Sequence, residues 1–244
     1  MGILLEICVD DPAGIREAVA GGADRLELCS ALELGGLTPS AALIEQAVAS
    51  GLPVHPMIRL RAGGYVLEDG DVPVMIEEIR LALARGAAGV VVGALLPDGR
   101  LDREAMARFR DAARDATIVL HRAIDLSIDP VAAVEETRVL GYDKVLSSGG
   151  AASAPEGAAT LARMVEVAGP HLSIMAGAGV RPDNAAALVA ATGVREIHGS
   201  ASRPGAPPEE KTICFGFAQG PRRITDRRIV AGIAAAIGQA ETRA

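Results

Sequence analysis

Aromatic residues are scarce in this chain. Three phenylalanines and two tyrosines are the only ones among 244 residues, and there is no tryptophan. Hydrophobic residues nevertheless make up 50% of the sequence, and most of them are alanine, valine, leucine and isoleucine. Branched aliphatic side chains are typical of sheets that are covered on both faces. The composition therefore favours a core of buried parallel strands.

Cysteine and positive charge are also limited. The three cysteines are an odd number, which fits reduced thiols better than a disulfide framework. A formal net charge of -7 argues against a nucleic-acid or anionic-membrane partner. No apolar run approaches the roughly 18 residues of a membrane span, and the opening MGILLEI lacks the basic region and cleavage site of a signal peptide. We therefore expect a cytoplasmic protein with no nucleic-acid or membrane partner.

Eight short apolar runs recur along the chain, and amphipathic stretches separate them. The runs, which we expect to be strands, are Ile3–Cys8, Arg25–Cys29, Val54–Arg59, Gly89–Gly93, Thr117–His121, Lys144–Ser148, Leu172–Ala176 and Arg195–Ser200. The expected helices cover residues 12–22, 39–50, 72–86, 102–114, 130–140, 155–168, 182–192 and 226–239.

Eight strand–helix units in a chain near the roughly 250 residues of one barrel are the layout of a (β/α)₈, or TIM, barrel. An open doubly wound sheet is the alternative, but no GxGxxG motif follows the first strand. We find no domain boundary, so residues 1–244 are predicted to form a single α/β domain. Only residues 201–225 lack a clear pattern, and we expect a long loop there that serves as a lid or an oligomer contact or is simply mobile.

Polar residues occupy alternate positions in the first two strands. Glu6 and Cys8 share one face of the first strand, and Glu27 and Cys29 share one face of the second. These faces must point into the barrel, because the outer faces meet apolar helices. Neighbouring strands should therefore place two Glu-x-Cys pairs side by side.

Other strands also carry polar residues. The third offers His55 and Arg59 on one face, and the fifth ends in His121 and Arg122 with Asp125 close behind. The eighth offers Glu196, His198 and Ser200 in alternation. Burying so many charged groups is costly unless they pair or serve a site. Because active sites of such barrels lie at the carboxyl ends of the strands, the sequence predicts a functional mouth there.

Two kinds of site fit these residues. In the first, Cys8 and Cys29 are soft thiolate ligands, which select Cu(I) or Zn(II). In the second, an enzyme such as an isomerase, lyase or hydrolase acts on a small anionic, phosphorylated or hydroxylated metabolite. Its candidate catalytic residues are Glu6, Glu27, His121, Asp125 and His198. Its candidate substrate- or anion-binding residues are His55, Arg59, Arg61, Arg122, Ser148, Gly177 and Gly179. We expect no organic cofactor.

Several segments resemble the CutC family, whose members are known as copper homeostasis proteins. The matching segments are LLEIC (4–8), GGADRLELCSALELGGLTPS (21–40), PVHPMIRLRAGG (53–64), HRAID (121–125), KVLSSGG (144–150), IMAGAGV (174–180) and EIHGSA (196–201). They follow one another from the first expected strand to the eighth, and GGADRLELC together with GGLTPS is distinctive.

The resemblance implies a (β/α)₈ barrel, a cytoplasmic role in copper tolerance or trafficking, and a homodimer or higher homo-oligomer. It places the family's copper thiols at Cys8 and Cys29. It places the family's polar mouth at Glu6, Glu27, His55, Arg59, Arg61, His121, Arg122, Asp125 and His198. The expected partner is therefore a copper ion, Cu(I), or a small anionic metabolite, and the sequence leaves open whether the protein is an enzyme.

Overall fold

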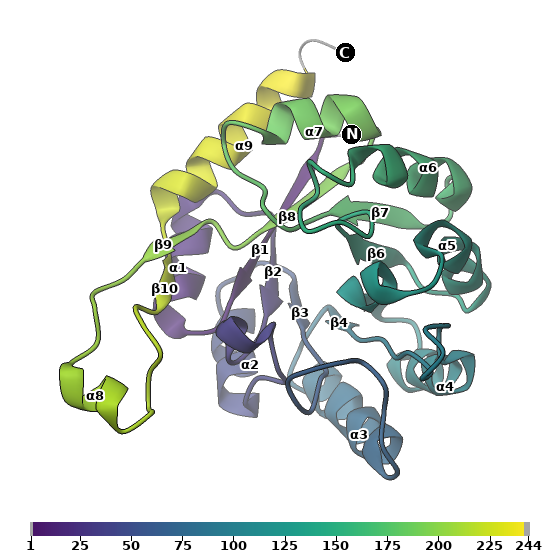
Figure 1. Ribbon diagram of the computed structural model, residues 1–244, viewed down its shortest axis with the longest axis horizontal. Coiled ribbons are helices and arrows are strands. Elements are labelled where there is room, and N and C mark those ends of the chain that lie inside the picture. The colour runs from purple at the N-terminus through teal and green to yellow at the C-terminus, as the bar shows by residue number, and fades with distance from the viewer. Residues whose placement is uncertain (1, 242–244) are drawn as a thin grey trace.

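The computed structural model describes residues 2–241, with side chains through residue 238. Eight parallel strands follow one another in the chain, each followed by a helix on the outside (Figure 1). The strands are β1 (Leu4–Val9), β2 (Arg25–Leu28), β3 (Val54–Pro56), β4 (Gly89–Val91), β5 (Thr117–Leu120), β6 (Lys144–Ser147), β7 (Ser173–Ala176) and β8 (Glu196–Gly199).

The helices surround these strands. They are α1 (Pro12–Gly21), α2 (Ala41–Val48), α3 (Asp71–Ala84), α4 (Arg103–Ala113), α5 (Pro130–Val139), α6 (Ala158–Ala168), α7 (Ala185–Thr192) and α9 (Arg227–Glu241), with the short 3₁₀ helices η1 (Leu32–Leu34) and η2 (Arg122–Leu126). Each predicted strand and helix has a counterpart, although most ends differ. Within the described part of the chain, no helix combines the length and hydropathy that crossing a membrane requires.

The sheet closes on itself. Its strands are hydrogen-bonded in the order β3-β2-β1-β8-β7-β6-β5-β4. The outermost pair, β3 and β4, is joined by N–H groups of Ala88 and Ile58, which donate to the carbonyl oxygens of Val54 (3.0 Å) and Val91 (2.8 Å). The predicted (β/α)₈ barrel is therefore confirmed.

Local signals in the sequence set the helix ends. The Asp11 carboxylate accepts a hydrogen bond from the Gly14 N–H (2.6 Å), and Pro12 occupies the first turn of α1. Gly22 ends the helix with φ 89°, a left-handed conformation that a side chain would strain. The chain can then turn directly into β2.

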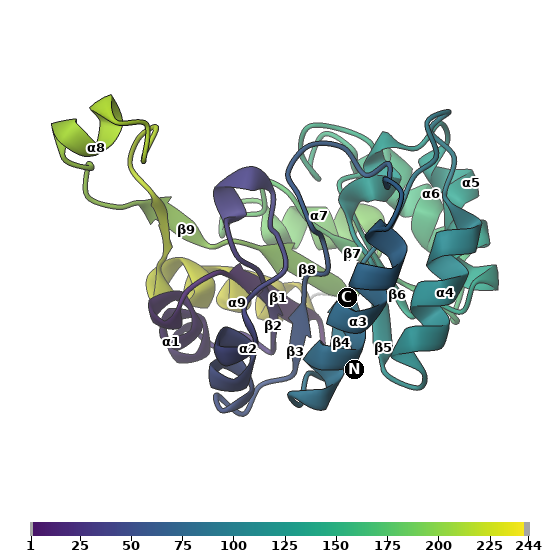
Figure 2. The same cartoon turned by 90° about the horizontal axis from the view of Figure 1, so that it is seen from below.

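Residues 201–225 differ from the expected loop. They contain β9 (Ser202–Pro204) and β10 (Arg223–Thr225), which pair antiparallel, and the short helix α8 (Glu210–Cys214) between them. This arm, residues 202–225, projects from the barrel with α8 at its tip (Figures 1 and 2). β9 and β10 are largely exposed and carry no apolar run like those of the buried barrel strands, which is why the sequence pattern did not reveal them.

Apolar side chains form two layers. The larger layer lies between the strands and the helices. The smaller one lies inside the barrel and consists of Cys29, Met57, Val91, Val119, Leu146 and Met175. The inner faces of β1, β2 and β8 carry charged residues instead, so the barrel interior has an apolar part and a polar part.

Candidate functional site

Glu6 is the centre of the polar part. The strand register places it beside Arg25 on β2 and His198 on β8. Arg25 Nε donates to Glu6 Oε2 (2.5 Å), and His198 Nδ1 lies 2.9 Å from Glu6 Oε1. Burial alone would raise the pKa of Glu6, but the hydrogen bond from His198 and the charge of Arg25 hold it far below its usual range. Glu6 therefore stays ionised and fixes the orientation of the His198 ring.

A second carboxylate, Glu196, lies closer to the amino ends of the strands. Its Oε2 accepts from Arg25 Nη2 (2.5 Å), and its Oε1 accepts from Lys144 Nζ (2.5 Å) and Ser173 Oγ (2.6 Å). Arg25, Lys144 and Ser173 were not among the predicted site residues. Arg25 alternates with Glu27, so extending the same alternation to the first residue of each strand would have found it.

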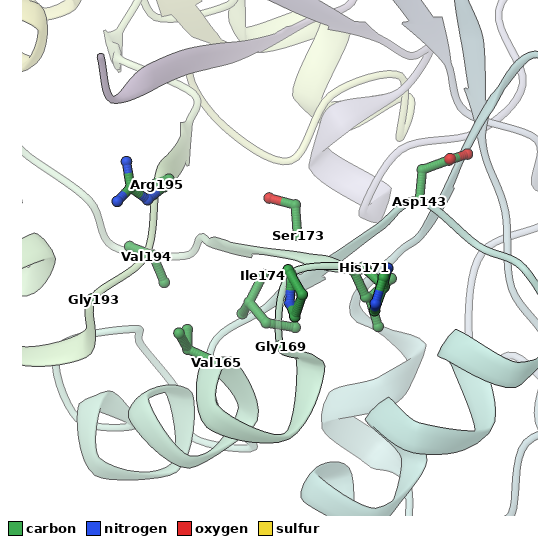
Figure 3. Close-up of a pocket in the computed structure, with 11 residues that line it drawn as sticks. Asp143, Val165, Gly169, His171, Ser173, Ile174, Gly193, Val194 and Arg195 are labelled. Atoms are coloured by element: carbon green, nitrogen blue, oxygen red, sulfur yellow. The ribbon is translucent and has the colours of Figure 1, made fainter. Parts of the chain in front are cut away.

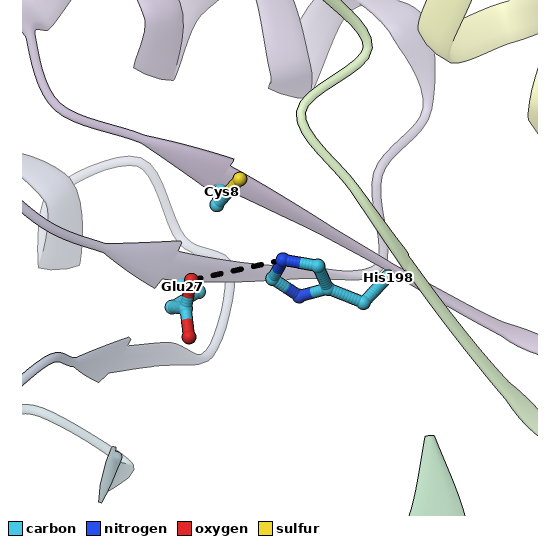
Figure 4. Close-up of side chains that lie close together, drawn as sticks. All are labelled: Cys8, Glu27 and His198. Carbon is cyan, nitrogen blue, oxygen red and sulfur yellow. Dashed lines mark ion pairs between the residues drawn. The ribbon is translucent and has the colours of Figure 1, made fainter. Parts of the chain in front are cut away.

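Three potential ligands converge next to Glu6. Single donor atoms of Cys8, Glu27 and His198 all lie within 4.8 Å of one another, and all three residues are buried (Figure 4). The His198 Nε2 atom lies 3.7 Å from Glu27 Oε2. Because His198 Nδ1 is hydrogen-bonded to Glu6, Nε2 is the ring nitrogen that remains free to bind an ion.

Burial and charge both alter proton binding in this cluster. Burial, followed by repulsion from Glu6, raises the pKa of Glu27 to about 7 despite the opposing charge of His198. Burial would lower the pKa of His198, but the charges of Glu27 and Cys8 raise it well above its usual value. Burial raises the pKa of the Cys8 thiol. Glu27 can therefore exchange a proton near neutral pH.

Cys29 has a different environment from Cys8. Its Sγ atom lies 3.7 Å from Glu27 Oε2, and its side chain packs in the apolar part of the interior. The Gly36 backbone covers it closely, since a Cβ on Gly36 would lie 2.8 Å from Cys29 Sγ. Among the described residues, the group of converging ligands pairs Cys8 with Glu27 and His198 and does not include Cys29.

The other two predicted histidines are buried in neutral form. His55 Nδ1 lies 3.7 Å from Glu6 Oε2, and burial lowers the His55 pKa to about 4. Burial, together with the charge of Arg59, lowers the pKa of His121 to about 3. The His121 ring lies against Tyr65, with 4.5 Å between the ring centroids.

Two of the three predicted anion-binding arginines have carboxylate partners. Arg61 donates to both oxygens of Asp71 (2.5 and 2.6 Å). Arg122 donates to Asp125 Oδ2 (2.7 Å) and to Ser148 Oγ (2.8 Å). These guanidinium groups therefore already have a counter-charge.

Arg59 connects loops. Its Nη1 donates to the carbonyl oxygens of Leu34 and Gly36 (3.0 Å each), and its Nη2 donates to that of Gly63 (2.6 Å). Its guanidinium carbon lies 4.9 Å from the centroid of the Tyr65 ring. The predicted Arg59 thus holds the GGLTPS and RLRAGG segments together.

Asp125, Gly177 and Gly179, which were also predicted, form hydrogen bonds with other residues of the protein. Asp125 Oδ1 accepts from Ser147 Oγ (2.5 Å), and the Gly177 N–H donates to the Ser147 carbonyl (2.9 Å). The Gly179 carbonyl accepts from Asn184 Nδ2 (2.9 Å). These contacts shape the loops that follow β5, β6 and β7.

Two cavities adjoin the barrel. The larger, about 440 Å³, is drawn in Figure 3 and is lined by residues at the amino ends of β6, β7 and β8. Its polar lining is Asp143, His171, Ser173 and Arg195. The smaller, about 250 Å³, lies at the carboxyl end of β3 and β4, and its polar lining is Arg59, Arg61, Tyr65, Glu68 and Asp71.

Known proteins resemble this chain over most of its length. Residues 3–203 match the CutC family. A Caulobacter vibrioides (strain NA1000 / CB15N) protein named family protein CutC is 46% identical over 231 residues, which are 94% of each chain. Its Rhizobium meliloti (strain 1021) namesake is 45% identical over 92% of this chain and 91% of its own. The solved structure of a Streptococcus agalactiae CutC, named for copper homeostasis, aligns with a TM-score of 0.77 at 29% identity over 81% of this chain and 98% of its own. The chain belongs to the CutC family.

Proposed function

We propose that this protein acts in copper homeostasis by binding Cu(I) inside the barrel, with Cys8 Sγ and His198 Nε2 as ligands and Glu27 beside them. The observation that supports this is the convergence of these three side chains within 4.8 Å. Two ligands at about 2.0–2.3 Å on opposite sides of one ion are separated by up to about 4.6 Å. Thiolate and imidazole are donors that Cu(I) accepts. The Streptococcus agalactiae relative is itself named for copper homeostasis.

Glu6 orients the proposed ligand His198 through a hydrogen bond. A metal-binding histidine commonly donates its second ring N–H to a carboxylate, which fixes the tautomer and the ring orientation. His198 Nδ1 has this partner in Glu6 at 2.9 Å. Arg25 holds the same carboxylate from the other side, so the Nε2 atom is aimed before an ion arrives.

An anaerobic titration of Cu(I) against a coloured Cu(I) chelator tests the proposal. We expect Cys8→Ser to weaken Cu(I) binding by more than about tenfold, the low end of the effect of disturbing a metal site. Cys29→Ser should bind nearly as well as the unmodified protein, because Cys29 is covered by Gly36 and lies outside the converging group.

Cys214→Ser is the matched control, because Cys214 is an exposed thiol on the arm, far along the chain from the barrel interior. It should leave the affinity unchanged. Equal Cu(I) affinity in the unmodified protein and the Cys8→Ser variant would refute the proposed site. An equal loss in Cys8→Ser and Cys29→Ser would favour the paired thiols instead.

A second candidate function is acid–base catalysis at the same place. It is favoured by Glu27, whose pKa of about 7 lets it accept and release a proton at neutral pH. His198 would supply the second proton-transfer group, held by Glu6. The two functions are separable, because a reaction of Glu27 and His198 would survive Cys8→Ser whereas Cu(I) binding would not.

A further inference from the structure

Backbone N–H groups are left unused where β7 and β8 stop pairing. The ladder between these strands ends at their carboxyl ends. Just beyond it, the N–H groups of Ala178, Gly179 and Ser200 have no acceptor among the residues that the structure describes. Gly179 and Ser200 are exposed and Ala178 is half-buried, so a ligand from solvent can reach them. The predicted Gly177 differs from them, because its N–H already donates to a carbonyl of the protein.

The geometry of one peptide directs an unused N–H group towards β8. The peptide that joins Ala178 to Gly179 is trans, so its C=O and N–H point in opposite directions. The Ala178 carbonyl accepts from the Ala154 N–H (2.9 Å) in the loop after β6. Because β7 lies between β6 and β8, the Gly179 N–H points to the side of the loop after β8. The loops after β7 and β8 adjoin, since a Cβ on Gly199 would lie 3.9 Å from Val180 Cβ.

The loop after β7 is also strained. Ala178 has φ 77°, a left-handed conformation that residues with a side chain rarely adopt, and Gly179 follows with φ 73°. Strained backbone persists where the surrounding structure holds it, and it is concentrated at sites that bind ligands.

The arm brings a cation and two hydroxyl groups to the loop after β8. Arg223 Nε donates to Ser202 Oγ (2.9 Å), and Arg223 Nη2 donates to the Ser202 carbonyl. Ser202 Oγ in turn lies 2.9 Å from Ser200 Oγ. One of the two hydroxyl protons forms the bond between these serines, and the other has no acceptor in the described part of the chain. Across residues 2–238, Arg223 has no carboxylate partner and its Nη1 atom bonds to nothing.

The acidic side chains of the neighbouring segments do not neutralise this cation. Asp226 accepts from Arg203 Nε (2.8 Å). Glu156 accepts from a serine hydroxyl in the loop after β6 (2.9 Å). Arg181 and Asp183, farther along the loop after β7, carry opposite charges. The guanidinium group on the arm therefore keeps its positive charge for a ligand.

We propose that the loops after β7 and β8, together with Arg223 of the arm, bind the phosphate group of a small phosphorylated metabolite. Unpaired backbone N–H groups of neighbouring loops favour an anion, and a guanidinium group binds phosphate strongly. The three terminal oxygens of a phosphate monoester accept from the N–H groups, the free hydroxyl proton and Arg223 Nη1. A carboxylate has only two oxygens, with about four lone pairs, and leaves donors unused. The site uses neither Cys8 nor His198 and does not depend on Cu(I) binding.

Inorganic phosphate and glycerol 3-phosphate are the probes, with acetate at the same ionic strength for comparison. We expect both phosphates to shift the amide resonances of Ala178, Gly179 and Ser200 in ¹H–¹⁵N spectra of the unmodified protein. Acetate should shift them much less. The amides of Gly149 and Gly150 are internal controls, because they donate to a serine hydroxyl (2.8 Å) and an aspartate carboxylate (3.1 Å) of the protein. Their resonances should stay in place.

Arg223→Gln removes the cation from the exposed arm, and it should weaken phosphate binding by about tenfold or more. Arg195→Gln is the matched control, because Arg195 is an exposed arginine at the opposite, amino end of β8. It loses the same charge and should bind phosphate normally. Unmoved amides of the two loops, equal affinity for acetate, or an equal effect of the two substitutions would overturn the proposal. Absence of Cu(I) binding would refute the copper function and leave this proposal intact.

Discussion

Arg25 joins two buried carboxylates, Glu6 on β1 and Glu196 on β8, by contacts of 2.5 Å each. Its own side chain is 4% exposed. Removing one partner of a buried ion pair leaves a charge in a medium that solvates it poorly, which costs more than the intact pair contributes. Arg25 is therefore the residue whose loss should disturb the interior most.

We predict that Arg25→Met lowers the free energy of unfolding by about 3–5 kcal/mol at pH 7, measured by urea denaturation. The folded pKa of Glu6 lies below its unfolded value, so its contribution is present above the unfolded pKa and disappears as the pH falls through the folded pKa. Without Arg25 the pKa of Glu6 rises. The difference between the two proteins should therefore narrow as the pH falls below about 4.5, the ordinary pKa of this carboxyl, towards the lower folded value.

Arg80→Met is the control, because Arg80 pairs with Glu77 on the exposed surface of α3. Its stability should equal that of the unmodified protein within the error of the measurement. Equal stability of Arg25→Met and Arg80→Met would contradict the claim that the ion pairs of Arg25 with Glu6 and Glu196 stabilise the fold.

The sequence identified many residues of the site but not their partners. Alternation along strands placed Glu6, Cys8, Glu27 and His198 inside the barrel, because strand periodicity is a local property. The partners of Arg59 could not be predicted, since they are carbonyls of loops whose conformation depends on the whole fold. Arg61 was expected to bind an anion. Its pairing with Asp71 could not be predicted for the same reason.

At the level of the elements, glycines on one strand make room for histidines of another. A Cβ on Gly89 of β4 would lie 3.0 Å from His55 Cδ2 of β3, and one on Gly177, just after β7, would lie 3.3 Å from the His198 ring of β8. Contacts of this kind are tighter than a Cβ atom normally makes. The buried histidines therefore depend on neighbouring positions that have no side chain.

We predict that Gly89→Ala lowers the free energy of unfolding by about 1–3 kcal/mol in thermal or urea denaturation. The added Cβ would lie 2.4 Å from the Thr117 carbonyl oxygen, a backbone atom of β5 that cannot move without shifting the strand. Gly64→Ala is the control, because nothing lies within 4 Å of its added Cβ. Equal stability of the two variants would show that β4 and β5 can move apart to accommodate the added Cβ at little cost in free energy.

The order and type of the barrel elements followed from the sequence, whereas the arm did not. Strands such as β1 form a clear apolar run, and helices such as α4 have an amphipathic pattern and an N-cap, Asp102. The arm has three-residue strands held by longer-range contacts, including those of Arg222 with Asp10 (2.9 Å) and Asp11 (2.7 Å). Such contacts join residues more than 200 positions apart, so they cannot be predicted from the local sequence pattern.

Across the whole molecule, the interior is divided between two kinds of packing. Met57, Val91, Val119 and Leu146 fill one part of the barrel, and the charged groups of β1, β2 and β8 occupy the other. This division places Cys8 among charged residues and Cys29 among apolar ones. The two thiols therefore differ in environment although their strands are neighbours, and in the described part of the chain the group of converging ligands pairs only Cys8 with a histidine.

X-ray absorption at the copper edge of the Cu(I)-loaded Cys214→Ser protein tests this arrangement most directly. Removing the exposed thiol leaves Cys8 and Cys29 as the only cysteines. We predict one sulfur and at least one nitrogen or oxygen around each copper ion, from Cys8 with His198 and Glu27. A coordination shell with two sulfurs and no nitrogen would contradict the account.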